Sequence, residues 1–134
     1  MAKVSPAQRT LRLLKKEGGY PEVVEKFIKP PHMKFGFRRD LWNFVDILSS
    51  NPLKGEILFV QVCDMASLPA HREKCFLNPL LKPLLLAGGV FEIHGWRKLK
   101  MKNTDGKKGK REKWECYRER YTSSSEIPEI KPSV

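Results

Sequence analysis

The spacing of apolar residues in the first part of the chain predicts a helix followed by a strand. Ser5 is a favoured N-cap residue, Pro6 suits the first helical position, and two consecutive glycines follow the leucine stripe. We therefore expect a helix over residues 5–17. The alternation in PEVVEKFI predicts a strand over 21–28, with a short helix as the alternative.

Two apolar segments in the middle of the chain predict a pair of long strands. They span residues 33–50 and 56–63, and the segment between them contains Asn51, Pro52 and Gly55. Residues of these types favour tight turns, because they reach backbone conformations that other residues avoid. We therefore expect the two strands to pair as neighbours in one sheet.

The leucine-rich region that follows, residues 68–89, is predicted to be helical. Pro79 and Pro83 should split or kink it, because a proline inside a helix removes a backbone hydrogen bond and clashes with the preceding turn. A pair of glycines is expected to end the region.

The remaining sequence predicts two more strands and a tail. Residues 90–100 and 113–122 alternate as strands do, and the basic segment 101–112 between them is rich in turn-forming residues. The second strand is expected to lie at an edge, paired with the first. This order of elements predicts an α/β protein with a mixed sheet flanked by helices. Residues 1–122 should form one domain and 123–134 a flexible tail.

The charge of the chain narrows the choice of partner. With 134 residues, the chain is long enough for one hydrophobic core. It has 26 Lys and Arg against 15 Asp and Glu, a net charge of +11, which favours a polyanionic partner. DNA, RNA and an anionic membrane surface all meet this requirement.

Apolar runs and cysteines bear on the compartment. The longest apolar run is interrupted by a lysine and a proline, so no segment is predicted to cross a membrane. The first ten residues lack the apolar core of a signal peptide. Three widely spaced cysteines indicate a reducing environment, so we expect a cytoplasmic protein.

Two polar residues stand inside the apolar strands of the middle region. Asp46 and Gln61 are each flanked by aliphatic residues, and a buried carboxylate must be paired, hydrogen-bonded or bound to a metal. If the strands pair, both side chains can share a face at one end of the sheet. With a third oxygen from Asp40 or Glu25, they would hold a hard cation such as Mg²⁺.

Three segments carry a resemblance to a known family. RRDLWNFVDIL, ILFVQVCD and GGVFEIHGWRK resemble a small phage and bacterial branch of the PD-(D/E)XK, or restriction-endonuclease-like, nucleases, over about residues 8–100. The resemblance implies an α-β-β-β-α-β core with a mixed sheet flanked by helices, to which this chain adds a C-terminal strand. It also implies metal-dependent cleavage of DNA.

The resemblance assigns roles by position. Asp46 matches the metal-binding aspartate of the family, Gln61 its second acid and Cys63 its lysine. The last two are departures, and a cysteine cannot replace an ammonium group at the phosphate. The resemblance therefore implies that the cation comes from the next helix, from Lys74 or Arg72. These two lie about 200° apart around a helix, and Lys74 is the expected one.

Each candidate ligand also has a purely structural explanation. Asp46 could pair with Arg38 or Arg39, as buried charges often do. Gln61 could satisfy backbone groups in the core, and Asp40 could belong to a surface ion pair. Glu25, on the predicted strand 21–28, could simply face solvent.

A basic surface is expected on the C-terminal half of the chain. Its lysines and arginines are dense and are flanked by Trp96 and Trp114, as is typical of nucleic-acid contacts; the alternative is a solvated loop. The expected contacts are Arg72, Arg97, Lys98, Lys100, Lys107, Lys108, Lys110 and Arg111.

These observations together predict a Mg²⁺- or Mn²⁺-dependent endonuclease acting on DNA, with Asp46, Gln61 and Lys74 as catalytic residues. A homodimer is compatible with this prediction, because enzymes of the class often pair two sites to cut two strands. The first alternative is a catalytically degenerate nuclease-fold module that binds nucleic acid without cutting it. The second is a basic protein–protein adaptor.

Overall fold

The computed structural model describes residues 4–102, 106 and 108–128 of the chain. It is a mixed α/β structure in which a five-stranded sheet is flanked by helices, as the sequence predicts. The helical elements are α1 (Pro6–Lys16), the 3₁₀ turn η1 (Met65–Ser67), α2 (Leu68–Leu77) and α3 (Leu81–Leu86). The strands are β1 (Tyr20–Val23), β2 (Lys26–Ile28), β3 (Phe37–Arg39), β4 (Ile47–Asn51), β5 (Glu56–Asp64), β6 (Val90–Lys102) and β7 (Lys108–Tyr121).

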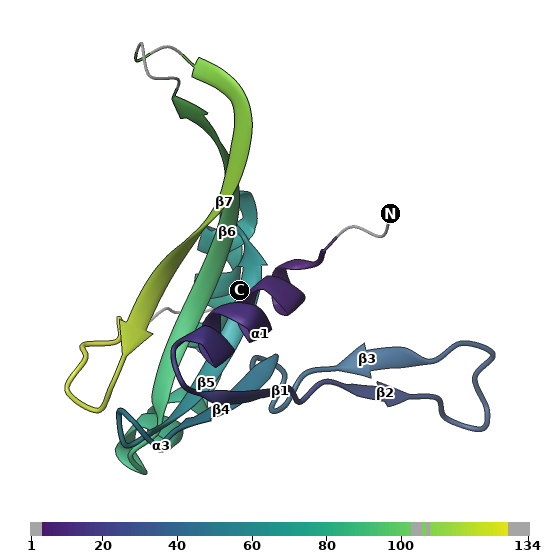
Figure 1. Cartoon of the computed structure of the whole chain (residues 1–134). Helices are drawn as coiled ribbons and strands as arrows, with labels where there is room; N and C mark the ends of the chain where they lie inside the picture. Colours follow the sequence, from purple (N-terminus) through teal and green to yellow (C-terminus); the bar gives the residue numbers. More distant parts are fainter. Residues whose placement is uncertain (1–3, 103–105, 107, 129–134) are drawn as a thin grey trace.

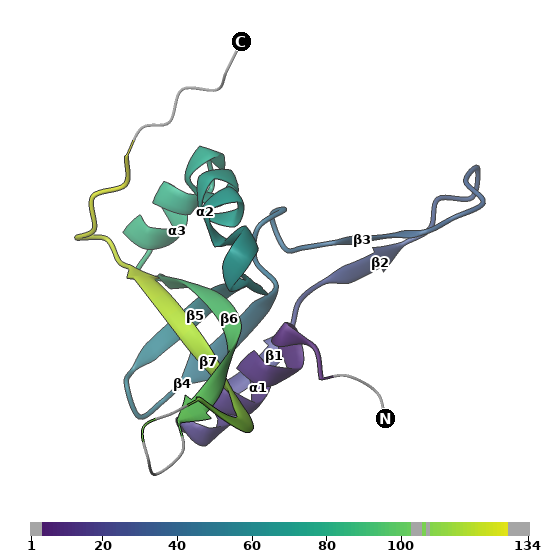
Figure 2. The same cartoon turned by 90° about the horizontal axis from the view of Figure 1, so that it is seen from above.

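The main sheet has the strand order β1-β4-β5-β6-β7. Strands β5 and β6 are parallel, and the other neighbours are antiparallel. A parallel pair needs a crossover connection, which η1, α2 and α3 provide. Figure 2 shows α1 on one side of the sheet and α2 with α3 on the other. None of the described helices is long and apolar enough to cross a membrane.

Each face of the sheet buries its own apolar cluster. On the α1 face, Leu14 packs with Ile47 and Val60. On the opposite face, Phe44 and Phe91 pack with the leucines of α2 and α3. The central strands are thus covered on both sides, and their ends carry the polar residues discussed below.

The first helix forms as predicted. The Ser5 hydroxyl accepts a hydrogen bond from the Gln8 N–H at 3.2 Å, and the Gln8 side chain accepts one from the Ser5 N–H at 3.3 Å. This reciprocal pair is a capping box, which satisfies two backbone donors at the start of a helix. The helix ends before Gly18, whose φ of 91° suits a glycine.

The two strands predicted before the central turn are wrong in their extent. Segment 21–28 is divided between β1 and β2, which pair with different strands. Segment 33–50 is divided between β3 and β4 by a turn in which Trp42 and Asn43 have φ values of 54° and 67°. A left-handed backbone at two successive residues reverses the chain and cannot continue a strand.

The predicted helical region splits at a proline. Helix α2 ends at Leu77, and Asn78 accepts a hydrogen bond from the Leu80 N–H at 2.9 Å, while α3 begins at Leu81. Pro79 lies in this gap, as expected. Pro83 lies in the first turn of α3, where its missing N–H is not needed.

The prediction of a turn-rich segment over 101–112 is wrong at both ends of the segment, while residues 103–105 and 107 lie outside the described residues. Strand β6 continues to Lys102 and β7 starts at Lys108, so the two strands form a long antiparallel arm. Figure 1 shows the ends of β6 and β7 extending beyond the rest of the sheet. In the described part of the tail, Ile127 packs against the core on the α2 face.

A second arm, between β1 and β4 in the chain, is formed by β2 and β3. Strands β2 and β3 pair only with each other, in a separate two-stranded sheet. Figures 1 and 2 both show this hairpin projecting away from the main sheet. The body therefore carries two β-hairpin arms.

Candidate functional site

The turn between β3 and β4 brings two carboxyl groups together. Leu41 and Val45 exchange both of their backbone hydrogen bonds, at N···O distances of 3.0 and 2.9 Å. Asp40 precedes Leu41 and Asp46 follows Val45, so this closed loop places the two acids side by side. Their contact arises without the unbroken strand that the sequence predicts.

Strands β4 and β5 then fix the position of Asp46. Its N–H donates to the Val60 carbonyl at 2.8 Å, and its own carbonyl accepts from the Val24 N–H at 3.0 Å. Its Oδ2 accepts from the Gln61 Nε2 at 2.6 Å and from the Val62 N–H at 2.8 Å. The structure thus brings Asp46 and Gln61 together at the start of β4.

The environment of Asp46 is unusual for a carboxylate. Its pKa is raised from 3.8 to about 7, mainly by burial and further by the adjacent carboxyl group of Asp40. The Val62 N–H and the charge of Lys74 act in the opposite direction on this pKa. Two carboxyl groups this close resist being ionised together, and a bound cation would remove that repulsion.

Lys74 reaches this pair of acids from α2. Its Nζ lies 3.7 Å from Asp40 Oδ2. Arg72, two residues earlier, points elsewhere: its Nε lies 2.7 Å from Glu119 Oε1 and its second nitrogen 2.5 Å from Oε2. The two side chains therefore diverge, as their spacing on a helix predicts.

Asp40 and Lys74 line an open hollow at the base of the β2–β3 arm. Its volume is about 460 Å³. The lining residues are Phe37, Arg38, Arg39, Asp40, Asn43 and Lys74. Of the two acids, Asp40 lines the hollow, together with the cationic side chain of Lys74.

The two departures from the family pattern have clear surroundings. Gln61 is buried, and its Oε1 accepts from the Cys75 thiol with an S···O distance of 3.8 Å. The pKa of Cys63 is raised to about 11, mainly by burial, so its thiol is neutral at pH 7. The position that matches the family's lysine therefore supplies no positive charge.

The remaining predicted ligand, Glu25, is engaged elsewhere. Its Oε2 lies 3.5 Å from an Arg38 nitrogen. Within the described residues, no group of three or more His, Cys, Asp or Glu side chains is arranged to hold a metal ion. The groups left as candidate ligands are the carboxylates of Asp40 and Asp46 and the Gln61 amide, whose nitrogen faces Asp46 and whose oxygen faces Cys75. This set suits Mg²⁺ or Mn²⁺, since Mg²⁺ commonly binds through one or two carboxylates and keeps several waters.

The predicted basic surface lies along the β6–β7 arm. Arg97 pairs with Glu115 at 2.7 Å and Lys98 with Glu112 at 2.8 Å, whereas Lys100 is exposed. Arg111 is also exposed. Lys107 and the side chains of Lys108 and Lys110 lie outside the described residues.

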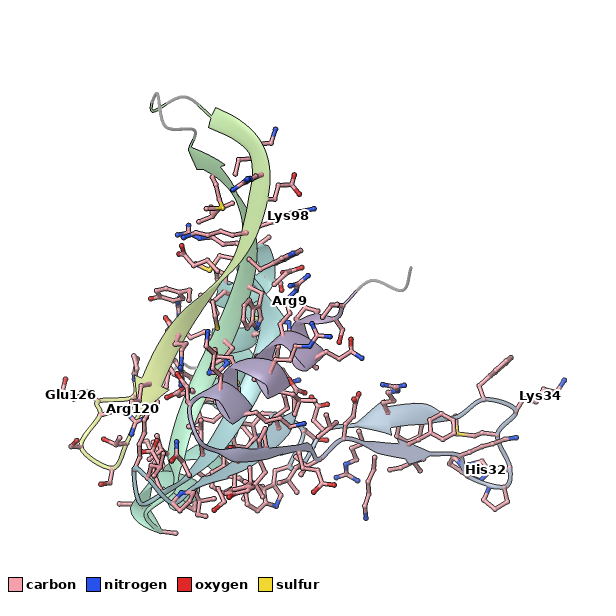
Figure 3. The ribbon with its side chains drawn as sticks, in the orientation of Figure 1. Arg9, His32, Lys34, Lys98, Arg120 and Glu126 are labelled. Carbon is pink, nitrogen blue, oxygen red and sulfur yellow. The ribbon has the colours of Figure 1, made fainter. Side chains whose placement is uncertain are left out.

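An aromatic residue sits at the base of this arm with cations around it. The Arg9 guanidinium lies 4.0 Å from the centre of the Trp114 ring, and the Lys98 Nζ lies 5.8 Å from it. Figure 3 shows Arg9 on α1 and Lys98 on the arm on the same side of the molecule. Arg9 from α1 and Lys98 from β6 therefore both lie against Trp114.

Sequence reasoning missed a buried polar network beneath α1. Thr10 Oγ1 lies 3.1 Å from His94 Nδ1 and accepts from Trp96 Nε1 at 2.9 Å, and His94 Nε2 lies 2.8 Å from Glu92 Oε1. Glu92 also accepts from Arg118 Nε at 2.9 Å. The signal in the sequence was the alternation of Glu92, His94 and Trp96 along the strand β6.

The network holds His94 as a neutral ring. The Trp96 indole N–H donates to Thr10 Oγ1. Burial lowers the pKa of His94, so its ring carries one hydrogen at neutral pH, and the ionised Glu92 carboxylate can only accept a hydrogen bond. His94 Nε2 therefore carries the hydrogen that Glu92 accepts. Thr10, His94 and Glu92 are buried, and their polar atoms are hydrogen-bonded within the network. The network therefore holds α1 against the sheet and has a structural role.

Two carboxyl groups, an amide and an ammonium group thus meet beside an open hollow at the base of the β2–β3 arm. Their function has to be argued from this geometry. A comparison with protein-family models, curated proteins and solved structures finds no match for the chain.

Proposed function

We propose that the chain is a divalent-metal-dependent nuclease of the PD-(D/E)XK class that hydrolyses phosphodiester bonds in DNA. The observation that carries the proposal is the contact between Asp46 and Gln61 on neighbouring strands, with Asp40 and Lys74 beside them. The order of elements supports it. Helix α1 is followed by the antiparallel strands β1, β4 and β5, then by a helical crossover and the parallel strand β6.

Asp46, Asp40 and Gln61 would hold the Mg²⁺ or Mn²⁺ ion. When bound, the ion would supply Lewis acidity at the phosphate and lower the pKa of an attacking water. Gln61 presents its nitrogen to Asp46 here, so its amide must rotate to offer the oxygen instead. Burial and the strand hydrogen bonds keep Asp46 in place during that change.

Lys74 supplies the positive charge that Cys63 lacks. Its exposed ammonium group lies beside Asp40 and lines the hollow. From there it can stabilise the negative charge that develops on a phosphate during hydrolysis. The basic β6–β7 arm would bind the rest of the DNA backbone.

Cleavage of plasmid and oligonucleotide DNA with Mg²⁺, Mn²⁺ or EDTA tests the proposal. The wild-type chain should cut with either metal and not with EDTA. Lys74→Ala should lower kcat by a factor of about 100 or more, because it removes charge stabilisation in the transition state. Lys54→Ala, an exposed lysine in the β4–β5 turn, is the matched control and should cut normally. Equal rates for Lys74→Ala and Lys54→Ala would contradict the role of Lys74.

A catalytically degenerate module is the second candidate, and the neutral thiol of Cys63 favours it. Such a module would bind DNA but remain inactive with every metal. Cys63→Lys restores the family pattern and separates the two cases. If the wild type is inactive and Cys63→Lys cuts DNA, the chain is a degenerate nuclease. If the wild type cuts and Cys63→Lys partly rescues Lys74→Ala, it is an enzyme that has moved its lysine.

A further inference from the structure

The β2–β3 arm has a composition that its own hairpin does not explain. Residues 26–39 contain five cations and no acid. Lys26 lies directly opposite Arg39 across the two strands, and like charges in this position destabilise a hairpin. A two-stranded hairpin is at best marginally stable in water. An anionic partner would relieve this repulsion and stabilise the arm.

Three phenylalanines on the arm are exposed. The exposed fractions of Phe27, Phe35 and Phe37 are 69%, 81% and 45%. The Phe27 ring lies against Gly36, where an added Cβ would come within 2.2 Å of it. That contact orients the Phe27 ring and leaves most of it open to a ligand. Exposed aromatic rings between cations are the arrangement that stacks on bases while the cations bind phosphates.

The arm leads directly into the candidate site. Strand β3 ends at Arg39, and the next residue is Asp40. Phe37 and Arg39 line the same hollow as Lys74. Figure 3 shows His32 and Lys34 at the far end of the arm, away from the sheet. A strand of DNA lying along the arm would therefore enter the hollow at its base.

We propose that the β2–β3 arm binds unpaired bases, so that the substrate is single-stranded DNA or branched DNA with an unpaired segment. Phe27 and Phe35 stack on bases, and Lys26 and Arg39 contact the phosphates. Duplex DNA offers no base faces to these rings, because its bases are stacked on one another. A second copy of the chain is disfavoured as the partner, because each copy carries a net charge of +11. This inference rests on the proposed function for the identity of the polyanion.

Binding without cleavage tests the arm separately from the nuclease. Fluorescence anisotropy in EDTA compares wild type with Phe27→Ala/Phe35→Ala on a single strand and on a duplex of the same sequence. The double variant should lose roughly tenfold or more in affinity for the single strand, because it removes two rings that stack on bases. Its affinity for the duplex should change less than threefold. Tyr20→Ala removes an exposed aromatic ring away from the arm and is the matched control.

A 2-aminopurine base in the single strand reports stacking directly. Wild type and Tyr20→Ala should change its fluorescence on binding, and the double arm variant should not. Equal losses of affinity on both DNA forms, or no loss on either, would overturn the proposal. So would a sedimentation experiment in which the double variant converts a dimer to a monomer while single-strand binding is unchanged.

The two proposals fail in different ways. Suppose that the wild type never cuts DNA but prefers single strands, and that Phe27→Ala/Phe35→Ala abolishes this preference. The arm inference then stands and the nuclease proposal is refuted. If the wild type cuts duplex DNA and the arm rings do not affect binding, the nuclease stands and the arm inference is refuted.

Discussion

Asp46 shows how a single residue links stability to the proposed chemistry. The strand hydrogen bonds occupy its Oδ2, while burial and the carboxyl group of Asp40 oppose its ionisation. Such a group destabilises the fold when it is ionised, and under the proposed function a bound cation would offset this cost. The same reasoning explains why Gln61, a neutral neighbour, is tolerated where a third carboxylate would add more repulsion.

Asp46→Asn should therefore stabilise the metal-free protein. The amide oxygen can keep the bonds from Gln61 and Val62, and its nitrogen can donate to Asp40, so the repulsion disappears. We expect the free energy of unfolding in EDTA at pH 8 to rise by roughly 1–3 kcal/mol.

Urea unfolding in EDTA measures this change. Thermal unfolding with added Mn²⁺ tests whether Asp46 is a metal ligand. Mn²⁺ should raise the Tm of the wild type and leave that of Asp46→Asn unchanged. An equal Mn²⁺ shift in both proteins would show that Asp46 is not a ligand.

At the scale of elements, the two arms are where the alternation of the sequence is least informative. Segment 101–112 has charged residues on both sides of the strands, so its pattern resembles a solvated loop even though Lys100 pairs with Glu112 and Lys102 with Lys108 across the two strands. The sequence likewise does not indicate the β2–β3 arm, because β2 lies within the predicted strand 21–28 and β3 within the predicted strand 33–50. Alternation predicts strands that have one buried face, and a projecting hairpin has none.

The β6–β7 arm should bind DNA through its charge and without reading the sequence. Lys100→Ala combined with Arg111→Ala removes two exposed cations and should lower the slope of log K against log salt concentration by about 1.8 on duplex DNA. The loss of affinity should be similar for unrelated sequences.

Fluorescence anisotropy at several salt concentrations measures the slope, with Lys54→Ala as the control. An unchanged slope in the double variant would show that these two residues are only solvated.

For the whole molecule, the buried network joins α1 to the sheet through groups that must keep their charge states. The pKa of Glu92 is lowered from 4.5 to about 2: burial alone would raise it, but the hydrogen bond from His94 and the charge of Arg118 outweigh burial. The pKa of His94 is lowered, mainly by burial, although Glu92 opposes this. Glu17 and Arg120 are the other charged groups that contact the network.

The protein should therefore lose stability in acid. The unfolded chain takes up a proton at His94 below about pH 6.5, and at Glu92 below about 4.5, before the folded protein does. The free energy of unfolding should fall steadily as the pH is lowered from 7.5 to 4.

Urea unfolding in the Asp46→Asn background measures this dependence without the opposing effect of Asp46. Adding His94→Gln should flatten the part between about pH 6.5 and 5, whereas adding His32→Gln, on the exposed arm, should not. A flat profile in the first protein would show that the network does not control acid stability.

Features that depend on local chemistry can be predicted from the amino-acid sequence. The capping box at Ser5, the break at Pro79 and the apolar strands at the centre of the sheet follow from nearest neighbours and from burial on both faces. The pairing of Asp46 with Gln61 also follows, since two adjacent strands with polar residues at matching places leave few other arrangements.

The other groups that lie beside Asp46 and Gln61 could not be predicted from the sequence, because they are brought there by the fold. Asp40 reaches Asp46 through a left-handed turn at Trp42 and Asn43, which no alternation of apolar and polar residues encodes. The same fold turned Glu25 to Arg38 and Arg72 to Glu119, and it separated the two arms from the body. These outcomes depend on contacts between residues far apart in the chain, where small differences in packing and charge select one partner among several that the local sequence allows equally.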